Sequence, residues 1–225
     1  MRTCLIALAA LTGFVSHASA ALLYDNTTVD LLLTVPFSVG PYTGLGDQIQ
    51  LTSAGTATQA KLELFNNGDA GTFDVDLELF QIDSPVGSSL GLFLLSGVSS
   101  TGGDVIDLTF NLGAGVAVPQ NLVFVISVAN QSSANMDLGI DLFGGPSVGF
   151  SDPTSMIVAS AGPSYSEIPS AGNVYFQLSG TPAATTPEPS SFAAMLAGIA
   201  ALCFIRRHRV LNAASPVRTT SLTGG

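Results

Sequence analysis

Hydrophobic and polar residues alternate in several short segments of the chain, with the two-residue period of a β-strand that buries one face. The clearest example is 73–79, with the sequence FDVDLEL. Segment 122–129 is instead almost entirely apolar, as in a central strand covered on both faces. Further segments predicted as strands are 47–52, 61–65, 89–96, 106–110, 138–142, 155–159 and 173–179.

Turn residues separate these segments, and no segment from 21 to 186 has a helical period. Many short strands joined by Gly, Pro, Asn and Ser predict an all-β fold, an antiparallel, jelly-roll-like β-sandwich.

Two neighbouring segments, 61–65 and 72–79, predict a β-hairpin. The stretch between them, NNGDAG, is dense in turn residues. Pairing Phe65 with Thr72 keeps apolar residues on one face and sets Glu63 opposite the carboxylate at position 74 on the other. A shift of one residue would bury carboxylates. We therefore expect the two strands to be neighbours in one sheet.

The first 20 residues have the pattern of a secretory signal peptide. Arg2 supplies a positive start, 4–15 are apolar, and Ala18 and Ala20 occupy the A-x-A positions of a cleavage site. We expect the general secretion machinery to export the chain and signal peptidase to cut after Ala20. The exported body would then begin at Ala21.

The C-terminal part contains three features in a fixed order: a Pro-Glu-Pro triplet, an uncharged apolar run and a basic cluster. They consist of Pro187, Glu188 and Pro189, then 192–205, then Arg206, Arg207 and Arg209. As a helix, the run of 14 residues spans only about 21 Å, whereas the hydrocarbon core of a bilayer is about 30 Å thick. It is therefore a marginal membrane span, with the basic cluster on the cytoplasmic side.

This ordered trio resembles the PEP-CTERM sorting signal of exported bacterial proteins. The resemblance implies that exosortase, a membrane protease-transpeptidase, recognises the tail in the inner membrane and cuts it near Pro-Glu-Pro. The body would then reach the cell surface or the extracellular matrix. In the family the basic cluster ends the chain or nearly so, whereas here 210–225 follow it. The alternative is an ordinary single-pass C-terminal anchor.

These patterns divide the chain into five parts. We expect a signal peptide at 1–20, an exported β-sandwich at 21–179, a linker at 180–186, the sorting signal at 187–209 and a polar cytoplasmic extension at 210–225.

The composition of the body restricts its chemistry. Between 21 and 186 there are 12 Asp, three Glu and one base, Lys61, which gives a net charge of −14. This charge disfavours nucleic acid as a partner. All cysteines and histidines lie outside the body, at Cys4, Cys203, His17 and His208. Disulfides, Ser-His-Asp or Cys-His catalysis and a His/Cys zinc site are therefore excluded from it.

Carboxylates are the remaining candidates for chemistry. Asp74, Asp76 and Glu78 form a row on one strand face. They could be the paired acids of a glycan hydrolase, or they could simply form a solvated surface of the sheet. Asp69 in the preceding turn, together with Asp74 and Asp76, is a weak candidate for calcium, although no D-x-D-x-D-G loop is present. Two carboxylates that converge in a pocket would favour an enzyme, and a row on a convex sheet would not.

We expect a non-enzymatic surface or extracellular-matrix protein, sorted by exosortase and associated with exopolysaccharide or a biofilm matrix. The alternatives are an exported, carboxylate-dependent glycan hydrolase and a calcium-binding surface module. No cofactor is expected apart from calcium.

Overall fold

The computed structural model describes residues 20–37, 42–82, 88–160, 165–183, 198–200 and 202, and the chain divides into two compact units, 1–183 and 184–225. In the second unit, 198–200 and Leu202 are helical. Among the described residues, no helix is long and apolar enough to cross a membrane. The predicted signal peptide before Ala20, the Pro-Glu-Pro triplet and the arginine cluster lie outside the described residues.

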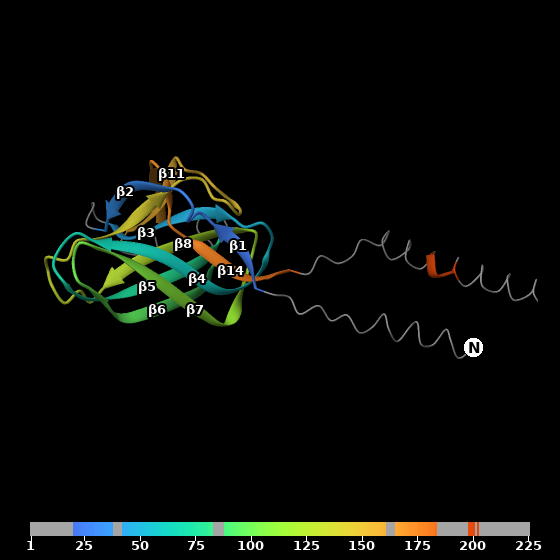
Figure 1. Ribbon diagram of the computed structural model, residues 1–225, viewed down its shortest axis with the longest axis horizontal. Coiled ribbons are helices and arrows are strands. Elements are labelled where there is room, and N and C mark those ends of the chain that lie inside the picture. Colours follow the sequence, from blue (N-terminus) through green and yellow to red (C-terminus); the bar gives the residue numbers. More distant parts are fainter. Residues whose placement is uncertain are drawn as a thin grey trace, which may run out of the picture. The chain divides into compact units, whose positions relative to one another are not determined.

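The described part of the first unit is a sandwich of two antiparallel, seven-stranded sheets, so the predicted all-β sandwich is confirmed (Figure 1). Sheet 1 consists of β1 (Ala21–Asp25), β2 (Asp30–Pro36), β4 (Gly55–Asn66), β7 (Asp104–Val118), β9 (Leu138–Phe143), β13 (Asn173–Val174) and β14 (Gln177–Pro182). Sheet 2 consists of β3 (Tyr42–Gln50), β5 (Gly71–Gln81), β6 (Ser89–Ser100), β8 (Asn121–Ala129), β10 (Phe150–Ser151), β11 (Ser155–Ser160) and β12 (Tyr165–Pro169).

Each sheet is built around one long or central strand. In sheet 1, β4 pairs with β7, β14 and β9; β1 then pairs with β14, and β2 and β13 pair with β9. In sheet 2 the order is β12-β11-β3-β8-β5-β6, and the short β10 pairs with β3. The strand order interleaves distant parts of the chain, so most ladders join segments far apart in the sequence.

Most of the predicted strands are confirmed, usually as parts of longer ones. The segment 47–52 overlaps the end of β3, which stops at Gln50, and 173–179 divides between β13 and β14. Four strands were not predicted: β1, β2, β10 and β12. They are short or lack a clean alternation of apolar and polar residues.

The predicted hairpin is wrong. The strands β4 and β5 belong to different sheets, and the chain crosses the sandwich between them. Leu64 and Phe73 are both buried, but they reach the core from opposite sheets. Glu63 lies opposite Asp107 of β7 and not opposite Asp74. The alternation of apolar and polar residues correctly predicted which face of each strand is buried. It did not predict which strand pairs with which, because alternation is a property of a single strand.

The side chain of Asn66 fixes this crossing. Its amide donates to the carbonyl of Asp69 at 2.8 Å and to the Ser100 hydroxyl at 2.9 Å. Its carbonyl accepts from the N–H groups of Gly68, at 2.9 Å, and Asp137, at 3.1 Å. Because Asn66 is fully buried, these bonds satisfy a polar group that would otherwise be costly to bury. The asparagine therefore joins both sheets at one end of the sandwich.

The core lies between the two sheets, and β8 is also covered on its outer face. On the inner side, Phe124 of β8 stacks on Phe176, with ring centroids 3.9 Å apart. On the outer side, Val125 is only 5% exposed and packs with Phe80 and Tyr165, whose ring centroids lie 4.9 Å apart. The prediction that 122–129 is a central strand covered on both faces is thus confirmed.

The first and last strands of the body lie side by side. Ala21 of β1 is the cross-strand partner of Gly180 of β14, and Figure 1 shows the two strands, in blue and orange, next to each other. The strand β14 continues to Pro182, and the N–H of Ala183 donates to the carbonyl of Ala54 at 2.8 Å. The first residues of the predicted linker, 180–182, are therefore part of the sheet.

Candidate functional site

The acidic row predicted on β5 exists, but its members form separate local contacts. Asp74 accepts hydrogen bonds from the Asn130 side chain at 2.7 Å and from the N–H of Gly97 at 2.8 Å, which lower the pKa of this carboxyl. The pKa of Asp76 is raised, first by partial burial and then by repulsion from Asp74. With Glu78 they lie half buried on the outward face of the strand.

The turn carboxylate Asp69 is also engaged locally. It accepts hydrogen bonds from the side chains of Asn135, at 3.0 Å, and Ser133, at 3.3 Å. Within the described part of the chain, no group of three His, Cys, Asp or Glu side chains is arranged to hold a metal ion. The structure therefore does not bring Asp69, Asp74 and Asp76 together into one calcium site.

A pocket of about 350 Å³ opens elsewhere, beside β3. On this side β3 pairs first with β11, up to Gly46, and then with β10, from Ile49 onwards. Asp47 and Gln48 lie between the two partners, where the chain turns from β10 into β11. The residues that line the pocket are Asp47, Gln48, Ile49, Gln50, Asn121, Phe150, Ser151, Asp152, Ser155 and Glu167.

Asp47 is the most unusual residue of this pocket. Its side chain lies on the core face of β3, between the buried Leu45 and Ile49, and is only 2% exposed. One carboxyl oxygen, Oδ1, accepts the N–H of Gln48 at 2.7 Å. The other oxygen, Oδ2, is buried and has no hydrogen-bond partner within 3.5 Å among the described residues, although the backbone N–H of Val174 lies close enough to lower the pKa of the carboxyl. A buried carboxyl with an unpaired oxygen is costly, so its retention calls for an explanation.

Two further carboxylates face the same pocket. Asp152 accepts the N–H and the hydroxyl of Thr154 at 2.9 and 2.7 Å, and these bonds lower its pKa. Glu167 is exposed on β12. Burial raises the pKa of Asp47 well above its ordinary value, and the charges of Asp152 and Glu167 raise it further, against the opposing effect of nearby backbone N–H groups. Asp47 therefore favours the protonated form and Asp152 the ionised form.

The inner wall of the pocket is tied to the core by a hydrogen bond. The hydroxyl of Ser151 lies 2.9 Å from that of Tyr24, which is completely buried. Burial raises the pKa of Tyr24 strongly, and the charge of Asp47 adds to this effect, while the bond to Ser151 opposes it. The phenol is therefore neutral, and it holds Ser151 at the wall of the pocket.

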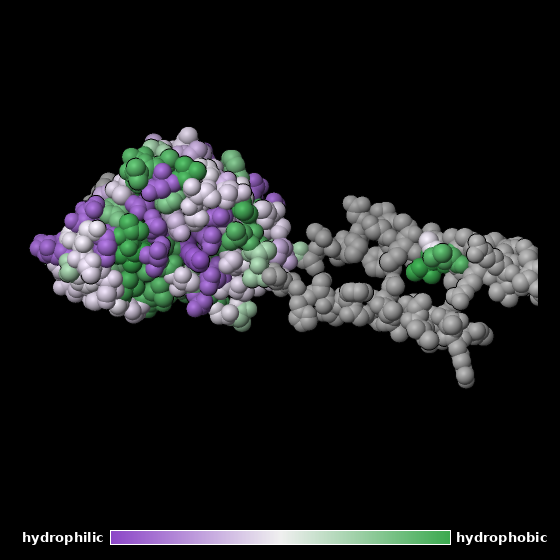
Figure 2. Space-filling view, viewed as in Figure 1, coloured by the Kyte–Doolittle hydropathy of each residue, from purple (hydrophilic) through white to green (hydrophobic). Residues whose placement is uncertain are grey.

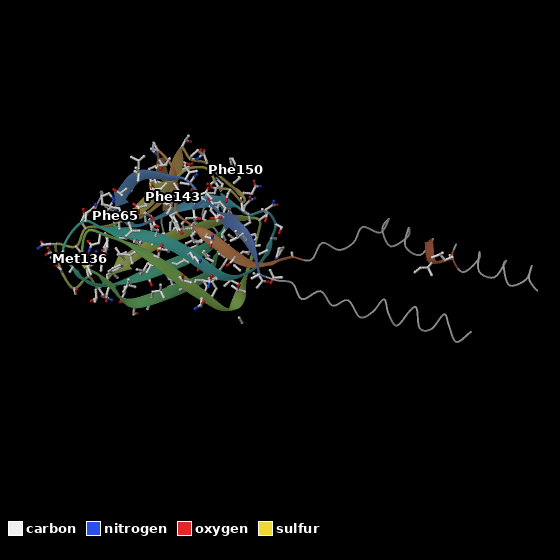
Figure 3. The ribbon with its side chains drawn as sticks, viewed as in Figure 1. Phe65, Met136, Phe143 and Phe150 are labelled. Atoms are coloured by element: carbon white, nitrogen blue, oxygen red, sulfur yellow. The ribbon has the colours of Figure 1, made fainter. Side chains whose placement is uncertain are left out.

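The rim of the pocket combines one aromatic ring with amide side chains. Phe150 is 61% exposed, and Gln48, Gln50 and Asn121 are exposed beside it. In Figure 3, Phe150 and Met136 lie at opposite ends of the sandwich. Met136 follows Asn135, which contacts Asp69, so the pocket is far from the turn that was predicted as a calcium site.

The sequence analysis did not single out Asp47, although one feature of the sequence points to it. Asp47 has the same parity along its strand as Ile49 and Leu51, both of which are buried. An acid in register with core residues is a stronger indication of function than acids that alternate with them. Asp152 and Glu167 could not be placed beside it without knowing that β10, β11 and β12 adjoin β3.

A second acidic group lies on the outer face of sheet 1. Glu63 and Asp141 share a hydrogen bond between their carboxyl groups; partial burial and this contact raise the pKa of Glu63 to about 7. Burial also raises the pKa of Asp141, and the charge of Asp30 adds to it. Together with Asp107, these groups concentrate negative charge at the centre of this sheet.

No protein family, curated protein or solved structure matches this chain. Among the described residues of the body, the pocket that Asp47 lines is the strongest candidate site.

Proposed function

We propose that this protein is an exported, non-enzymatic surface or extracellular-matrix protein. Signal peptidase would remove 1–20, exosortase would process the tail near Pro-Glu-Pro, and the β-sandwich would associate with exopolysaccharide or a biofilm matrix. The order of the sequence signals supports this proposal: a secretory start, an acidic body without Cys or His, and a tail that resembles the PEP-CTERM signal.

The observation that carries the proposal is the pairing of Ala21 with Gly180. The first strand begins at the residue that follows the predicted cleavage position, so a cut after Ala20 would leave the fold intact. The last strand ends at Pro182, close to β1. Both ends of the body therefore emerge at one end of the sandwich, an arrangement that suits a domain held at the membrane by its tail and then released.

The decisive experiment is the intact mass of the protein collected from the cell surface or medium of a host that has exosortase. We expect a chain that begins at Ala21 and lacks the residues after about Pro189. Replacing Pro187, Glu188 and Pro189 with alanine should leave uncut protein in the membrane.

The matched control replaces the preceding triplet, Ala184-Thr185-Thr186, with three alanines and should be processed normally. A surface form whose mass still includes 206–209 would instead identify a permanent anchor, and so would a Pro-Glu-Pro variant that is released like the wild type.

One observation favours a second candidate, a carboxylate-dependent glycan hydrolase. Asp47 has a raised pKa and Asp152 a lowered one, and both are among the residues that line one pocket. A protonated and an ionised acid on opposite sides of a glycosidic bond are the requirement for its hydrolysis. The pair differs from the one expected from the sequence, because Asp74 and Asp76 lie outside this pocket.

The two candidates separate in an assay for reducing ends released from a panel of extracellular glycans. The surface-protein proposal expects no release. Release that is lost in Asp47→Asn and retained in the control Asp76→Asn would establish the hydrolase in its place.

A further inference from the structure

We propose that the edge strand β6 pairs with β6 of a second copy of this chain, so that sheet 2 continues across two molecules. The pairing is antiparallel and symmetric, with Phe93 of β6 on the twofold axis. This contact goes beyond the proposed function, because it depends neither on the sorting of the protein nor on the pocket beside β3.

The backbone of β6 is open on one side. Within the described ranges β6 pairs with β5 alone, and Figure 1 shows it at the margin of the sandwich. The ladder to β5 shifts register at Leu90 and again at Ser96 and Gly97, and the segment 91–95 between these bulges is regular. The N–H and C=O groups of this segment that point away from β5 are therefore available to a further strand.

The strand β6 lacks the features that usually protect an edge from pairing. Its 12 residues, SLGLFLLSGVSS, include no charge and no proline. Of the other strands with a single partner, β1, β10 and β13 have five residues or fewer. The remaining ones carry charges or prolines, which are Asp30 and Pro36 on β2, Asp104 and Asp107 on β7, and Glu167 and Pro169 on β12. Charges and prolines prevent edge strands from pairing, so β6 is the edge that permits it.

The side chains of β6 suit a second copy of the same strand. On the outer face, Leu92 is 62% and Leu94 57% exposed. When Phe93 lies opposite itself in an antiparallel pair, Leu92 of each copy lies opposite Leu94 of the other. The four leucines then form one apolar cluster and are removed from water. On the inner face, the partly buried Phe93 and Leu95 at the border of the core are covered as well.

The charge of the body favours this edge for a contact between two copies. Because the body has a net charge of −14, most contacts between copies bring carboxylates together. The segment 84–103 contains no charged residue. The acids Asp76 and Glu78 of β5 lie opposite Leu94 and Leu92. Across the contact, Asp76 lies three strand spacings, about 14 Å, from Glu78 of the second copy, which exceeds the Debye length of roughly 10 Å at 0.1 M salt.

Exposed apolar side chains alone do not distinguish β6. Figure 2 shows that hydrophobic and hydrophilic residues are interspersed on the visible face of the sandwich, without one large apolar surface, as is ordinary for a folded protein. The distinguishing feature is the combination of an open backbone edge, exposed leucines and no charge. At the other end of sheet 2, the short β12 carries Glu167 and Pro169. The pairing therefore closes at two copies and does not continue as a fibre.

The test is sedimentation equilibrium of the full-length chain in a density-matched detergent, over a range of protein concentrations. We expect a monomer–dimer equilibrium, with a limiting protein mass of twice the 22.9 kDa of the chain. Added sodium chloride should strengthen the dimer, because it screens the repulsion between the carboxylates of the two copies.

The first variant combines Leu92→Lys with Leu94→Lys, which places lysine opposite lysine twice across the contact. Like charges directly opposite each other destabilise a strand pair, so the dissociation constant of the dimer should rise about tenfold or more. The matched control combines Leu32→Lys with Leu33→Lys on β2 of the other sheet and changes the net charge equally. It should dimerise like the wild type. All four leucines are exposed, and thermal unfolding checks that both variants are folded.

A second variant tests whether the partner is a copy of this chain in the proposed register. The combination of Leu92→Glu with Leu94→Glu should dissociate by the same repulsion. Mixing it with the lysine variant should restore a dimer, because each introduced lysine then faces an introduced glutamate of the other copy.

Three results would overturn the inference: a wild type that stays monomeric at every concentration, a dimer that the lysine variant leaves intact, or a mixture of the two variants that does not associate. The second result would place the contact elsewhere, such as in the C-terminal apolar run. Dissociation of the dimer by salt would indicate an ionic contact and overturn the inference as well. The intact mass of the surface form does not depend on β6, so the sorting proposal and this inference can fail independently of each other.

Discussion

The ring of Phe124 in β8 stacks on the ring of Phe176, with centroids 3.9 Å apart and planes 10° from parallel. Phe124 belongs to sheet 2, and Phe176 lies between β13 and β14 of sheet 1. Both side chains are fully buried. The pair therefore joins the two sheets near the middle of the core, where packing contributes most to stability.

We predict that Phe176→Ala destabilises the protein by about 3–5 kcal/mol, the usual cost of removing a buried phenylalanine. The measurement is chemical denaturation, in which the dependence of the free energy of unfolding on denaturant concentration should be the same for the wild type and the variant. Phe150→Ala is the matched control: the same substitution at a 61% exposed ring should change the stability by less than about 0.5 kcal/mol. Equal losses in the two variants would contradict the packing described here.

The second prediction concerns Gly46 in the centre of sheet 2. A Cβ at this position would clash with the carbonyl oxygen of Phe124 and lie 2.8 Å from its carbonyl carbon. These are backbone atoms in the neighbouring strand, so they cannot rotate away. Gly46→Ala should therefore destabilise the fold by at least about 2 kcal/mol, as other overpacked substitutions do.

Gly145→Ala provides the comparison, because nothing lies within 4 Å of the Cβ that it would add. Its expected effect is neutral or slightly stabilising, through the lower entropy of the unfolded chain. Thermal unfolding of the two variants should differ clearly in midpoint. If Gly46→Ala unfolds at the wild-type temperature, the close approach of β3 and β8 is incorrect.

The sequence was a good guide to which residues are buried and a poor guide to which strands are neighbours. Leu62 and Leu64 of β4 and Phe73 and Val75 of β5 are all in the core, as their alternation predicts. Alternation is a property of one strand, however, and pairing depends on the whole chain. The turn-like NNGDAG sequence forms a crossing between sheets, held by Asn66, and not a hairpin.

The candidate site shows the same limit. The buried position of Asp47 follows from its register with Ile49, which the sequence contains. Its neighbours come from 105 and 120 positions further along the chain, Asp152 and Glu167. They reach it because β10, β11 and β12 lie on the side of sheet 2 beyond β3. Short strands with weak patterns determine this arrangement, and these are the elements that sequence patterns identify least well.

The third prediction concerns the pH dependence of the pair Glu63 and Asp141. Their shared hydrogen bond needs one proton, and partial burial and this contact raise the pKa of Glu63 from 4.5 to about 7. Because the folded state binds this proton more tightly than the unfolded state, stability should fall as the pH rises from about 4.5 through 7. Glu63→Gln keeps a donor for Asp141 but does not titrate, so the variant should lose less stability over this range.

The check is the melting temperature of each protein between these pH values. Asp141→Asn should flatten the curve in the same way, and the double variant should show little further change, because both substitutions remove one interaction. Additive effects of the two substitutions would mean that the carboxyls do not share a proton.

The last prediction concerns the pH dependence of stability at Asp47. Burial raises its pKa far above the ordinary value of 3.8, so the folded protein holds this proton while the unfolded chain releases it. The stability linked to this proton is complete below about pH 4 and is lost as the pH rises through the pKa of the folded state. Asn resembles the protonated acid in shape and does not titrate, so Asp47→Asn should avoid this loss.

Asp47→Asn should therefore melt at the wild-type temperature near pH 4 and at a higher temperature than the wild type at pH 7 and above. A variant that is more stable at neutral pH would show that the buried acid reduces the stability of the fold, as groups retained for function commonly do. A lower melting temperature of the variant at neutral pH would instead show that the ionised carboxylate stabilises the fold. Thermal unfolding of the wild type and the variant at pH 4 and at pH 7 distinguishes the two outcomes, because only the first predicts a difference that grows with pH in favour of the variant.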